Sequence, residues 1–232
     1  AAAAQPLLDA IEAATGLPIA LEGFYRWIAF LPSKQDARVP VPNRYFGVFE
    51  DGVVKARGIE LRRHDTPPFV AGAQAAVLAY LARRAAEADT AVWRDCRADL
   101  LELVDGRLQA LRRGQIDLAD LLLAQRLSRP PAEYTAPSPA ARAAAQLQAA
   151  GKERYPGQRI RFVLTRGEPD VYAWGLPRPL DPARVDVTRY ETLTLRAVQT
   201  VLQPWGVSPG LLAEGLAGGW RQCRLPLGGG SG

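Results

Sequence analysis

The pattern of hydrophobic and polar positions changes along the chain, from strand-like in the first quarter to helical after it. A short amphipathic run over 7–15 predicts a helix that ends at Gly16. The segment 19–31 is apolar, aromatic and β-branched, which predicts one or two strands. From about residue 66 onward, apolar residues recur every three or four positions, which is typical of helices that bury one face.

A β-hairpin is the clearest local prediction. Two strand-like runs, 44–50 and 53–62, flank Asp51-Gly52. Asp-Gly between two such runs is typical of a two-residue type I′ turn. Lys55 and Arg57 are two positions apart on the second run, so they share one face of the predicted strand.

The rest of the chain reads as helices with one strand. Helices are predicted over 67–88, 93–113, 117–127, 138–151 and 186–202, with a last turn or two from 208, and a strand over 159–165. Strands before residue 66 and helices after it predict an α+β fold, with two sub-domains that meet near Asp65.

The amino-acid composition indicates the class of protein. Hydrophobic residues make up 48% and charged residues 23%, which is typical of a globular protein. No run approaches the roughly 18 uncharged apolar residues of a membrane helix, so no membrane contact is predicted. Two cysteines, Cys96 and Cys223, are too few for a disulfide framework or a zinc cage. We therefore expect a cytoplasmic protein.

The cationic residues are unusual. The net charge is +5 and the isoelectric point about 9.5. Only three of the 29 cations are lysine, so 26 are arginine, whose planar fork matches phosphate oxygens. This balance favours a polyanionic partner. The alternative is a GC-rich genome, which also enriches arginine, alanine, glycine and proline.

Both ends of the sequence read as cut. The chain has no methionine, begins with four alanines inside a predicted helix, and ends in a Gly-rich run over 228–232. We expect the C-terminal part of a longer protein, followed by a flexible tail over 218–232.

The residues alone do not assemble an active site. His64 is the only histidine, and beside Arg62 and Arg63 it reads as a surface or phosphate-facing residue. No phosphate-binding loop or dinucleotide fingerprint is present. Glu22 is an acid in an otherwise apolar segment, where a water-facing edge position explains it. Cys96 reads as a buried, inert thiol.

Several segments, in order, resemble family B DNA polymerases. In the first 65 residues these are Leu21-Glu22-Gly23-Phe24-Tyr25, Asn43-Arg44-Tyr45-Phe46-Gly47-Val48 and Arg57-Gly58-Ile59-Glu60-Leu61-Arg62-Arg63-His64-Asp65. Further along they are Leu127-Ser128-Arg129-Pro130-Pro131-Ala132-Glu133-Tyr134, Ser138-Pro139 to Leu147, Pro156-Gly157-Gln158-Arg159-Ile160 and Asp186 to Tyr190. The resemblance covers about residues 7 to 216.

The resemblance implies an architecture and a role. Residues 1–66 would be the C-terminal part of the palm domain, with its β-hairpin and strands, and 67–217 a mainly helical thumb. Such a portion grips primer–template DNA for templated nucleotide addition. The family's catalytic aspartates lie in upstream motifs that this sequence lacks, so an upstream part would carry them and bind most of the Mg²⁺. The isolated chain is then expected to be inactive.

The resemblance also assigns residues to the first region. Glu22 matches an auxiliary acid near the metal site. Arg44 and Tyr45 match the last two residues of a Lys-Lys-x-Tyr motif that holds DNA near the primer terminus. Pro42 and Asn43 replace its two lysines, and Lys34 or Arg38 would have to compensate.

The remaining assignments concern DNA contacts. Arg62, Arg63 and Asp65 match an Arg-Arg-Asp motif in which the acid orders neighbouring cations, with His64 as an inserted residue. The thumb residues Arg129, Tyr134 and Arg142 fall where the family touches duplex phosphates. The alternative is a non-catalytic, sequence-independent DNA-binding module derived from a polymerase thumb.

Overall fold

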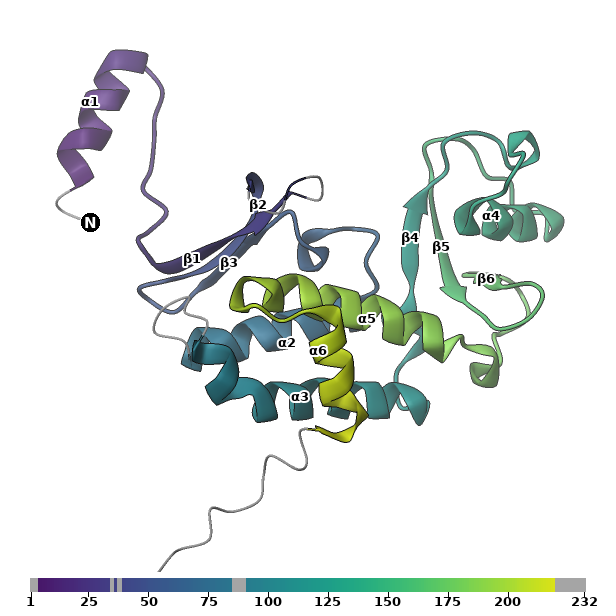
Figure 1. Ribbon diagram of the computed structural model, residues 1–232. Helices are drawn as coiled ribbons and strands as arrows, with labels where there is room; N and C mark the ends of the chain where they lie inside the picture. The colour runs from purple at the N-terminus through teal and green to yellow at the C-terminus, as the bar shows by residue number, and fades with distance from the viewer. Residues whose placement is uncertain (1–3, 34–35, 37–38, 85–90, 220–232) are drawn as a thin grey trace, which may run out of the picture.

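Two small antiparallel sheets lie at the two ends of a helical layer (Figure 1). The computed structural model describes residues 4–33, 36, 39–84 and 91–219. The first sheet has the order β1 (Tyr25–Pro32), β2 (Pro40–Phe49), β3 (Val54–Arg57), and the second β4 (Leu123–Arg126), β5 (Arg159–Leu164), β6 (Val171–Ala173). The α-helices are α1 (Gln5–Thr15), α2 (Pro68–Arg84), α3 (Ala91–Arg112), α4 (Pro139–Ala149), α5 (Val187–Leu202) and α6 (Pro209–Glu214).

Short helical turns connect these elements. They are η2 (Glu60–Arg62), η3 (Leu118–Leu121), η4 (Pro131–Glu133), η5 (Pro182–Arg184), η6 (Gln203–Trp205) and the π-helical turn η7 (Gly215–Gly219). The mixed helix and sheet content agrees with the predicted α+β class.

The first sheet covers one side of the helical layer with an alternating pattern. Trp27, Ala29 and Leu31 of β1 are buried, and Phe46 and Val48 of β2 lie on the same face by register. The opposite face carries side chains that remain partly or largely exposed, among them Ile28, Phe30, Tyr45, Lys55 and Arg57.

The predicted hairpin is present, but its predicted turn type is wrong. The Phe49 amide donates to the Val53 carbonyl at 2.9 Å, so three residues, not two, form the loop. Gly52 has a φ of 87°, and no non-glycine residue in the described part of the chain has a positive φ, whereas a type I′ turn needs positive φ at both central residues. The Asp51 carboxylate accepts from the Val53 amide at 2.9 Å. This bond holds the longer loop, in which only glycine is left-handed.

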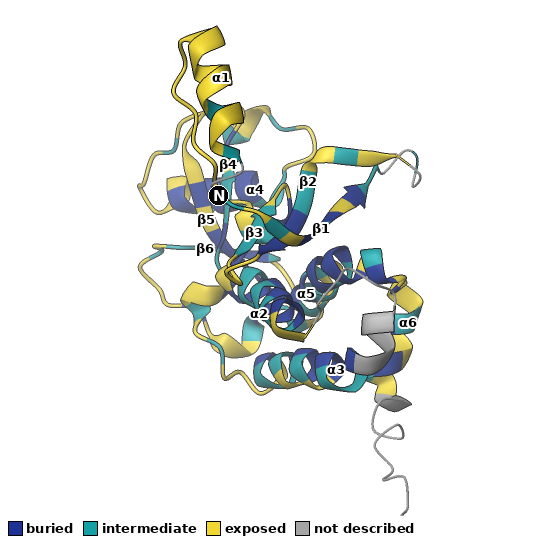
Figure 2. Cartoon of the chain, turned by 90° about the vertical axis from the view of Figure 1, so that its left-hand side faces the viewer, coloured by how far each residue is buried: buried dark blue, intermediate teal, exposed yellow. Residues whose placement is uncertain are grey.

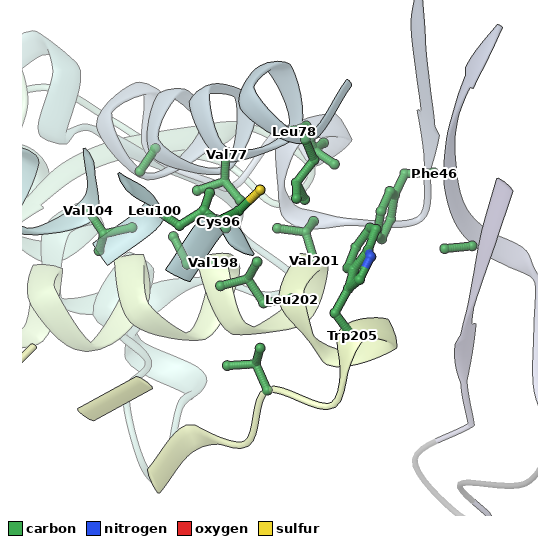
Figure 3. Packing of buried hydrophobic residues seen from close by; sticks show 14 of the residues in the cluster. Phe46, Val77, Leu78, Cys96, Leu100, Val104, Val198, Val201, Leu202 and Trp205 are labelled. Carbon is green, nitrogen blue, oxygen red and sulfur yellow. The ribbon is translucent and has the colours of Figure 1, made fainter. Parts of the chain in front are cut away.

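The first hydrophobic core joins the first sheet to α2, α3 and the second half of α5 (Figure 3). Phe46 is fully buried and stacks on Trp205 with ring centroids 5.8 Å apart. Trp27 meets the edge of the same indole at 5.7 Å. Cys96 is buried in this core, as predicted. Each such buried side chain stabilises the fold by about 1.5–3 kcal/mol.

The second core lies between the second sheet, α4 and the first half of α5. Phe162 of β5 and four alanines of α4 are among its buried members. Fully buried Tyr190 of α5 donates from its hydroxyl to the Leu121 carbonyl at 2.6 Å and accepts from the Leu164 amide at 3.0 Å. The α5 helix therefore belongs to both cores.

Two sequence predictions fail in the part of the chain that forms the second sheet and its core, which we call the second region; the part that forms the first sheet is the first region. The helix predicted over 117–127 is instead the turn η3 followed by strand β4. Asp117 caps only the turn, accepting from the Ala119 amide at 2.8 Å, and residues 123–126 pair with β5. The second sheet as a whole went unpredicted beyond β5, because β4 and β6 have four and three residues and are too short to show a period.

The first region also differs in extent from the prediction. Residues 17–24 belong to no strand, and β3 ends at Arg57 rather than reaching Arg62. Gly58, with a φ of 66°, turns the chain out of β3 toward η2. The helix starts at 138, 186 and 208 are correct, and Asp186 caps its helix as predicted. Ser138 and Ser208 also act as caps, and all three side chains accept from amides three residues on.

The predicted boundary between 66 and 67 stays a prediction, and the first core contains residues from both sides of it. Lys34, Arg38, Cys223 and residues 220–232 of the predicted tail lie outside the described residues. Within the described part of the chain, no helix is both long and apolar enough to cross a membrane.

Candidate nucleic-acid interface

A polar cleft of about 530 Å³ lies where β2, η2 and α5 meet. Three arginines line it: Arg44 from β2, Arg63 just after η2, and Arg196 from α5. The other lining residues are Val41, Gly58, Glu60, Gln199 and Thr200. Three arginines line the cleft against one lining carboxylate, Glu60, and a second carboxylate, Asp65, pairs with Arg63. These groups keep a net positive charge, which suits an anion.

The floor of the cleft is fixed by a buried amide. Gln74 of α2 is fully buried, and its Nε2 donates to Glu60 Oε2 at 2.8 Å and to the Ala197 carbonyl at 2.7 Å. Its Oε1 accepts from the Leu61 amide at 2.7 Å. Gln74 thereby ties η2 to α5, and with it the segment that carries Arg63. The sequence analysis missed Gln74, although a lone polar residue on an apolar helix stripe is a usable signal.

Gly58 is needed for the approach of η2 to β2. Besides its positive φ, a Cβ at this position would lie 2.2 Å from the Asn43 carbonyl oxygen. No side chain fits there. The glycine of the Gly-Ile-Glu segment therefore sets how closely the two arginine-bearing segments approach.

Asp65 holds Arg63 in place. The Arg63 Nε donates to Asp65 Oδ1 at 2.9 Å and Nη2 donates to Oδ2 at 2.7 Å, a bidentate pair. These hydrogen bonds lower the pKa of Asp65 and raise that of Arg63. An acid that orders a neighbouring cation is the arrangement the Arg-Arg-Asp resemblance implies. Arg62 and His64 are exposed.

Arg44 and Tyr45 lie on opposite faces of β2, as strand alternation requires. The Arg44 Nη1 donates to the Pro32 carbonyl at 3.4 Å and its side chain lines the cleft. Tyr45 packs its ring against Phe30 on the outer face, with centroids 5.6 Å apart. Burial and then a hydrogen bond with Tyr45 raise the pKa of Tyr25. The two predicted residues therefore address different surfaces.

Glu22 is largely exposed and forms an ion pair with Lys55 of β3. The described residues contain no group of three or more His, Cys, Asp or Glu side chains arranged to hold a metal ion. Glu22 and Lys55 by themselves do not form a metal site.

In the second region, Arg129 and Tyr134 form one turn after β4. The Arg129 guanidinium lies over the Tyr134 ring, 5.2 Å from its centroid. The Tyr134 oxygen accepts from the Ser128 and Arg129 amides at 3.1 and 3.3 Å and pairs with the Ser128 hydroxyl at 2.8 Å. The Ser128 hydrogen bond lowers the Tyr134 pKa most. The Tyr134 hydroxyl oxygen thus stabilises the turn through these hydrogen bonds, and the Arg129 side chain is exposed.

Arg142 is held by neighbours that the sequence did not indicate. Its Nε and Nη2 donate to the two Asp170 oxygens at 2.8 and 2.7 Å, and Nη1 donates to the Pro137 carbonyl. Arg189 also approaches Asp170, with Nη1 3.5 Å from Oδ2. Among the predicted residues, Arg44 and Arg63 thus line the same cleft, and Arg129 lies over the Tyr134 ring. Glu22 pairs with Lys55, and Arg142 pairs with Asp170.

The sequence of this chain matches a known family and several known proteins. The model of "DNA polymerase family B" matches residues 42–197. "DNA polymerase 2" of Aeropyrum pernix is 29% identical over 221 residues, which cover 94% of this chain and 25% of the relative. "DNA polymerase 1" of Saccharolobus solfataricus is 24% identical over 202 residues, which cover 85% and 21%.

A solved structure shows the same fold. The family B DNA polymerase from Pyrobaculum calidifontis superposes with a TM-score of 0.61 at 21% identity, covering 90% of this chain and 25% of that one. The chain therefore spans about a quarter of the length of the proteins it matches.

Proposed function

The chain belongs to DNA polymerase family B, and we propose that it supplies the palm-end and thumb portion that holds primer–template duplex during templated nucleotide addition. The observation that carries the proposal is the cleft in which Arg44, Arg63 and Arg196 converge. Arginine forks match phosphate oxygens, and a polymerase must hold duplex of any sequence through its backbone.

The paired groups around the cleft support a positioning role. Asp65 fixes the Arg63 fork, and Gln74 fixes the turn before it. An arginine held in one orientation loses less freedom when it binds phosphate. Arg44 and Arg63 are proposed as cleft contacts, Tyr45 as a contact on the other face of β2, and Arg62, Arg129, Tyr134 and Arg142 as contacts to or supports for the duplex.

Nucleotide addition needs groups that this part of the molecule does not assemble. In the proposal, Mg²⁺ and the catalytic aspartates belong to another polypeptide segment, with Glu22 as an auxiliary acid beside them. The Mg²⁺ would supply charge stabilisation for phosphoryl transfer when bound. Polymerase activity is accordingly a property of the assembled protein, and a cytoplasmic location is part of the proposal.

The first 53 residues supply a surface for that other segment. Exposed large hydrophobic side chains are concentrated there: Leu7, Ile11, Leu17, Ile19, Leu21, Phe24, Phe30, Val39 and Val53. The α1 helix has no buried residue and projects from the molecule (Figure 2). An isolated 11-residue helix is marginal in water, so packing against a partner would stabilise it. We propose that the polymerase segment carrying the aspartates covers this region.

A two-part experiment tests the proposal. The purified chain is assayed for Mg²⁺-dependent primer extension, alone and with a polypeptide that supplies the remaining polymerase segments. We expect no extension alone and restored extension on mixing. Extension by the chain alone would contradict the division of labour. DNA binding without any restoration by the added segment would favour the non-catalytic DNA-binding module instead.

A further inference from the structure

We propose that the exposed face of the second sheet is a second binding surface for the phosphate backbone of the same duplex, formed by Arg126, Arg159 and Arg161. This inference rests on the proposed function for the identity of the polyanion. The surface itself follows from the strand register and from the partners of each arginine.

The register places the three arginines together. Strands β4 and β5 are antiparallel, with Arg126 opposite Arg159 and Ala124 opposite Arg161. Directly opposed residues share a face of the sheet, and so do residues two apart on one strand. All three arginines are exposed, whereas Ile160 and Phe162, on the other face of β5, are buried in the second core.

No acid neutralises this cluster. Within the described residues, the side chains of Arg126, Arg159 and Arg161 make neither a hydrogen bond nor an ion pair, unlike Arg63, Arg112 and Arg142. Like charges directly opposite each other on neighbouring strands destabilise a sheet. An anion bound across the Arg126–Arg159 pair removes that repulsion, so the arrangement suits a protein that spends its working time on an anionic partner.

The shape of the cluster favours a polymer over a small anion. Arg159 and Arg161 are about 6.6 Å apart along β5, on an open strand surface rather than in a pocket. Pairing continues past Arg126, because the Leu127 amide donates to the Gln158 carbonyl at 3.0 Å. Arg129 follows in the next turn. A row of cations on an open face fits the repeating charges of a nucleic-acid backbone.

The α5 helix sets the relation between the two basic surfaces (Figure 1). Tyr190 near its start bonds to Leu164 at the end of β5, and Thr200 near its end lines the arginine cleft. The ten residues between them span about 15 Å of helix. Arg161 and Arg159 lie three and five residues before Leu164, roughly 10 and 17 Å along β5, so the arginine row begins a further stretch of strand away from α5. At about 3.4 Å per base pair, two basic surfaces separated in this way would contact phosphates several base pairs apart on one duplex.

Salt-dependent binding of the full chain tests the surface. Affinity for a duplex two helical turns long is measured over a series of salt concentrations. Each of Arg126→Ala, Arg159→Ala and Arg161→Ala should weaken binding several-fold and reduce the log–log salt slope by about 0.9. The triple alanine variant should reduce the slope by about 2.7. The triple lysine variant should keep the slope, because it keeps the charges. Arg83→Ala, an exposed arginine at the far end of α2, is the matched control.

Two further readouts separate binding from folding and locate the contact. The thermal midpoint of the triple alanine variant should stay unchanged or rise, since the substitutions remove repulsion. Neutral methylphosphonate linkages several base pairs from the primer end should abolish the difference between the triple variant and the unmodified chain. The same linkages at the primer end should leave that difference intact.

The outcomes distinguish this surface from the proposed function. If the triple alanine variant keeps its affinity and slope while Arg44→Ala weakens binding, the second-sheet surface is wrong and the cleft stands. A lowered thermal midpoint with unchanged binding likewise assigns these arginines to folding alone. If the unmodified chain does not bind duplex DNA at all, the proposed function fails and the surface fails with it.

Discussion

The two sheets have the same construction but differ in how many of their cationic side chains have hydrogen-bond or ion-pair partners. Each is a three-stranded antiparallel sheet with one face in a core that includes α5. Around the first sheet, Lys55 is engaged with Glu22, Arg44 with the Pro32 carbonyl and Arg63 with Asp65, whereas the exposed Arg57 of β3 has no hydrogen bond or ion pair within the described residues. On the second sheet, the strand arginines Arg126 and Arg159 face each other, and within the residues that the structure describes neither side chain makes a hydrogen bond or an ion pair.

Cationic side chains with partners and those without suit different tasks in binding an anion. A cation held by a partner keeps a defined direction, which suits contacts that must be placed accurately near a reacting end. Cations without partners add charge and tolerate sliding, which suits a duplex that moves through one step per nucleotide. Under the proposed function, the first sheet and its cleft would form the positioning part, and the second sheet the retaining part, of one interface.

The largest expected effect tests whether the two cores are one unit. Phe46→Ala should lower the free energy of unfolding by about 3–5 kcal/mol, because the side chain is fully buried between Trp27 and Trp205. Phe162→Ala should cost a similar amount in the second core. Denaturant unfolding followed by tryptophan fluorescence and circular dichroism should give one coincident transition, since α5 joins both cores.

Val53→Ala, at an exposed position in the hairpin, is the control and should change stability by less than about 0.5 kcal/mol. Two separate transitions in either phenylalanine variant would show that the regions unfold independently. The comparison drawn above would then concern two modules rather than one interface.

The positioning role predicts a large effect at Arg44 and a smaller one at Tyr45. Arg44→Ala should weaken duplex binding by about 1.5–3 kcal/mol, as expected for loss of a charge-assisted contact. Tyr45→Phe should cost about 0.5–1.5 kcal/mol through one hydrogen bond. Both are measured by fluorescence anisotropy, with Arg83→Ala as control. Equal behaviour of all three variants would make the hairpin purely structural.

Tyr190 tests the second core alone. Tyr190→Phe removes the partner of the Leu121 carbonyl and the Leu164 amide in a buried site, at a cost of about 1–3 kcal/mol. Tyr155→Phe, at an exposed tyrosine, should be nearly neutral. Burial raises the pKa of Tyr190 above its ordinary value. Above about pH 10 the unfolded state loses the Tyr190 proton more readily than the folded state, so the free energy of unfolding should fall as pH rises through this range.

The phenylalanine variant should lose less stability than the unmodified chain as pH rises through that range. Some loss should remain, because burial also raises the pKa of Tyr25 and Tyr80. An identical alkaline profile in both proteins would mean that Tyr190 is not buried as a neutral phenol.

The smallest expected effect concerns the Arg63–Asp65 pair. Its hydrogen bonds lower the pKa of Asp65 in the folded state, so the pair stabilises the fold above the unfolded pKa of about 3.9. That contribution should be lost as pH falls through the lower folded pKa. Asp65→Asn should flatten the acid side of the stability curve slightly and reduce duplex affinity through a less ordered Arg63. An unchanged affinity would show that Arg63 needs no positioning.

How much the sequence predicted depends on the range of the interactions involved. The helix starts at Ser138, Asp186 and Ser208 were predictable because a cap acts within three residues. The hairpin was predictable, but the length of its loop was not. Whether two residues or three form the loop, and so whether two residues or one adopt a positive φ, depends on the register of the two strands. Strand β4 escaped prediction because only its pairing with β5 makes it a strand.

The candidate site divides in the same way. The resemblance named Arg44, Arg63 and Asp65, and the structure shows the Arg63–Asp65 pair that it implied. It assigned no role to Gln74, Arg196 or the arginines of β5, whose roles arise from elements far apart in the chain. Arg142 looked like a free cation in sequence because Asp170 is 28 residues away.

The sharing of α5 between the cores has a consequence for how the chain is made. About a hundred residues separate the end of α2 from the start of α5, so at roughly 5–20 residues per second α2 waits some 5–20 seconds for its partner. During that interval Val77 and Leu78 remain uncovered on their α5 side. A nascent chain of this kind is a natural client for chaperones that bind apolar helices, and slowing its translation should raise the aggregated fraction more than slowing that of a protein whose core closes locally.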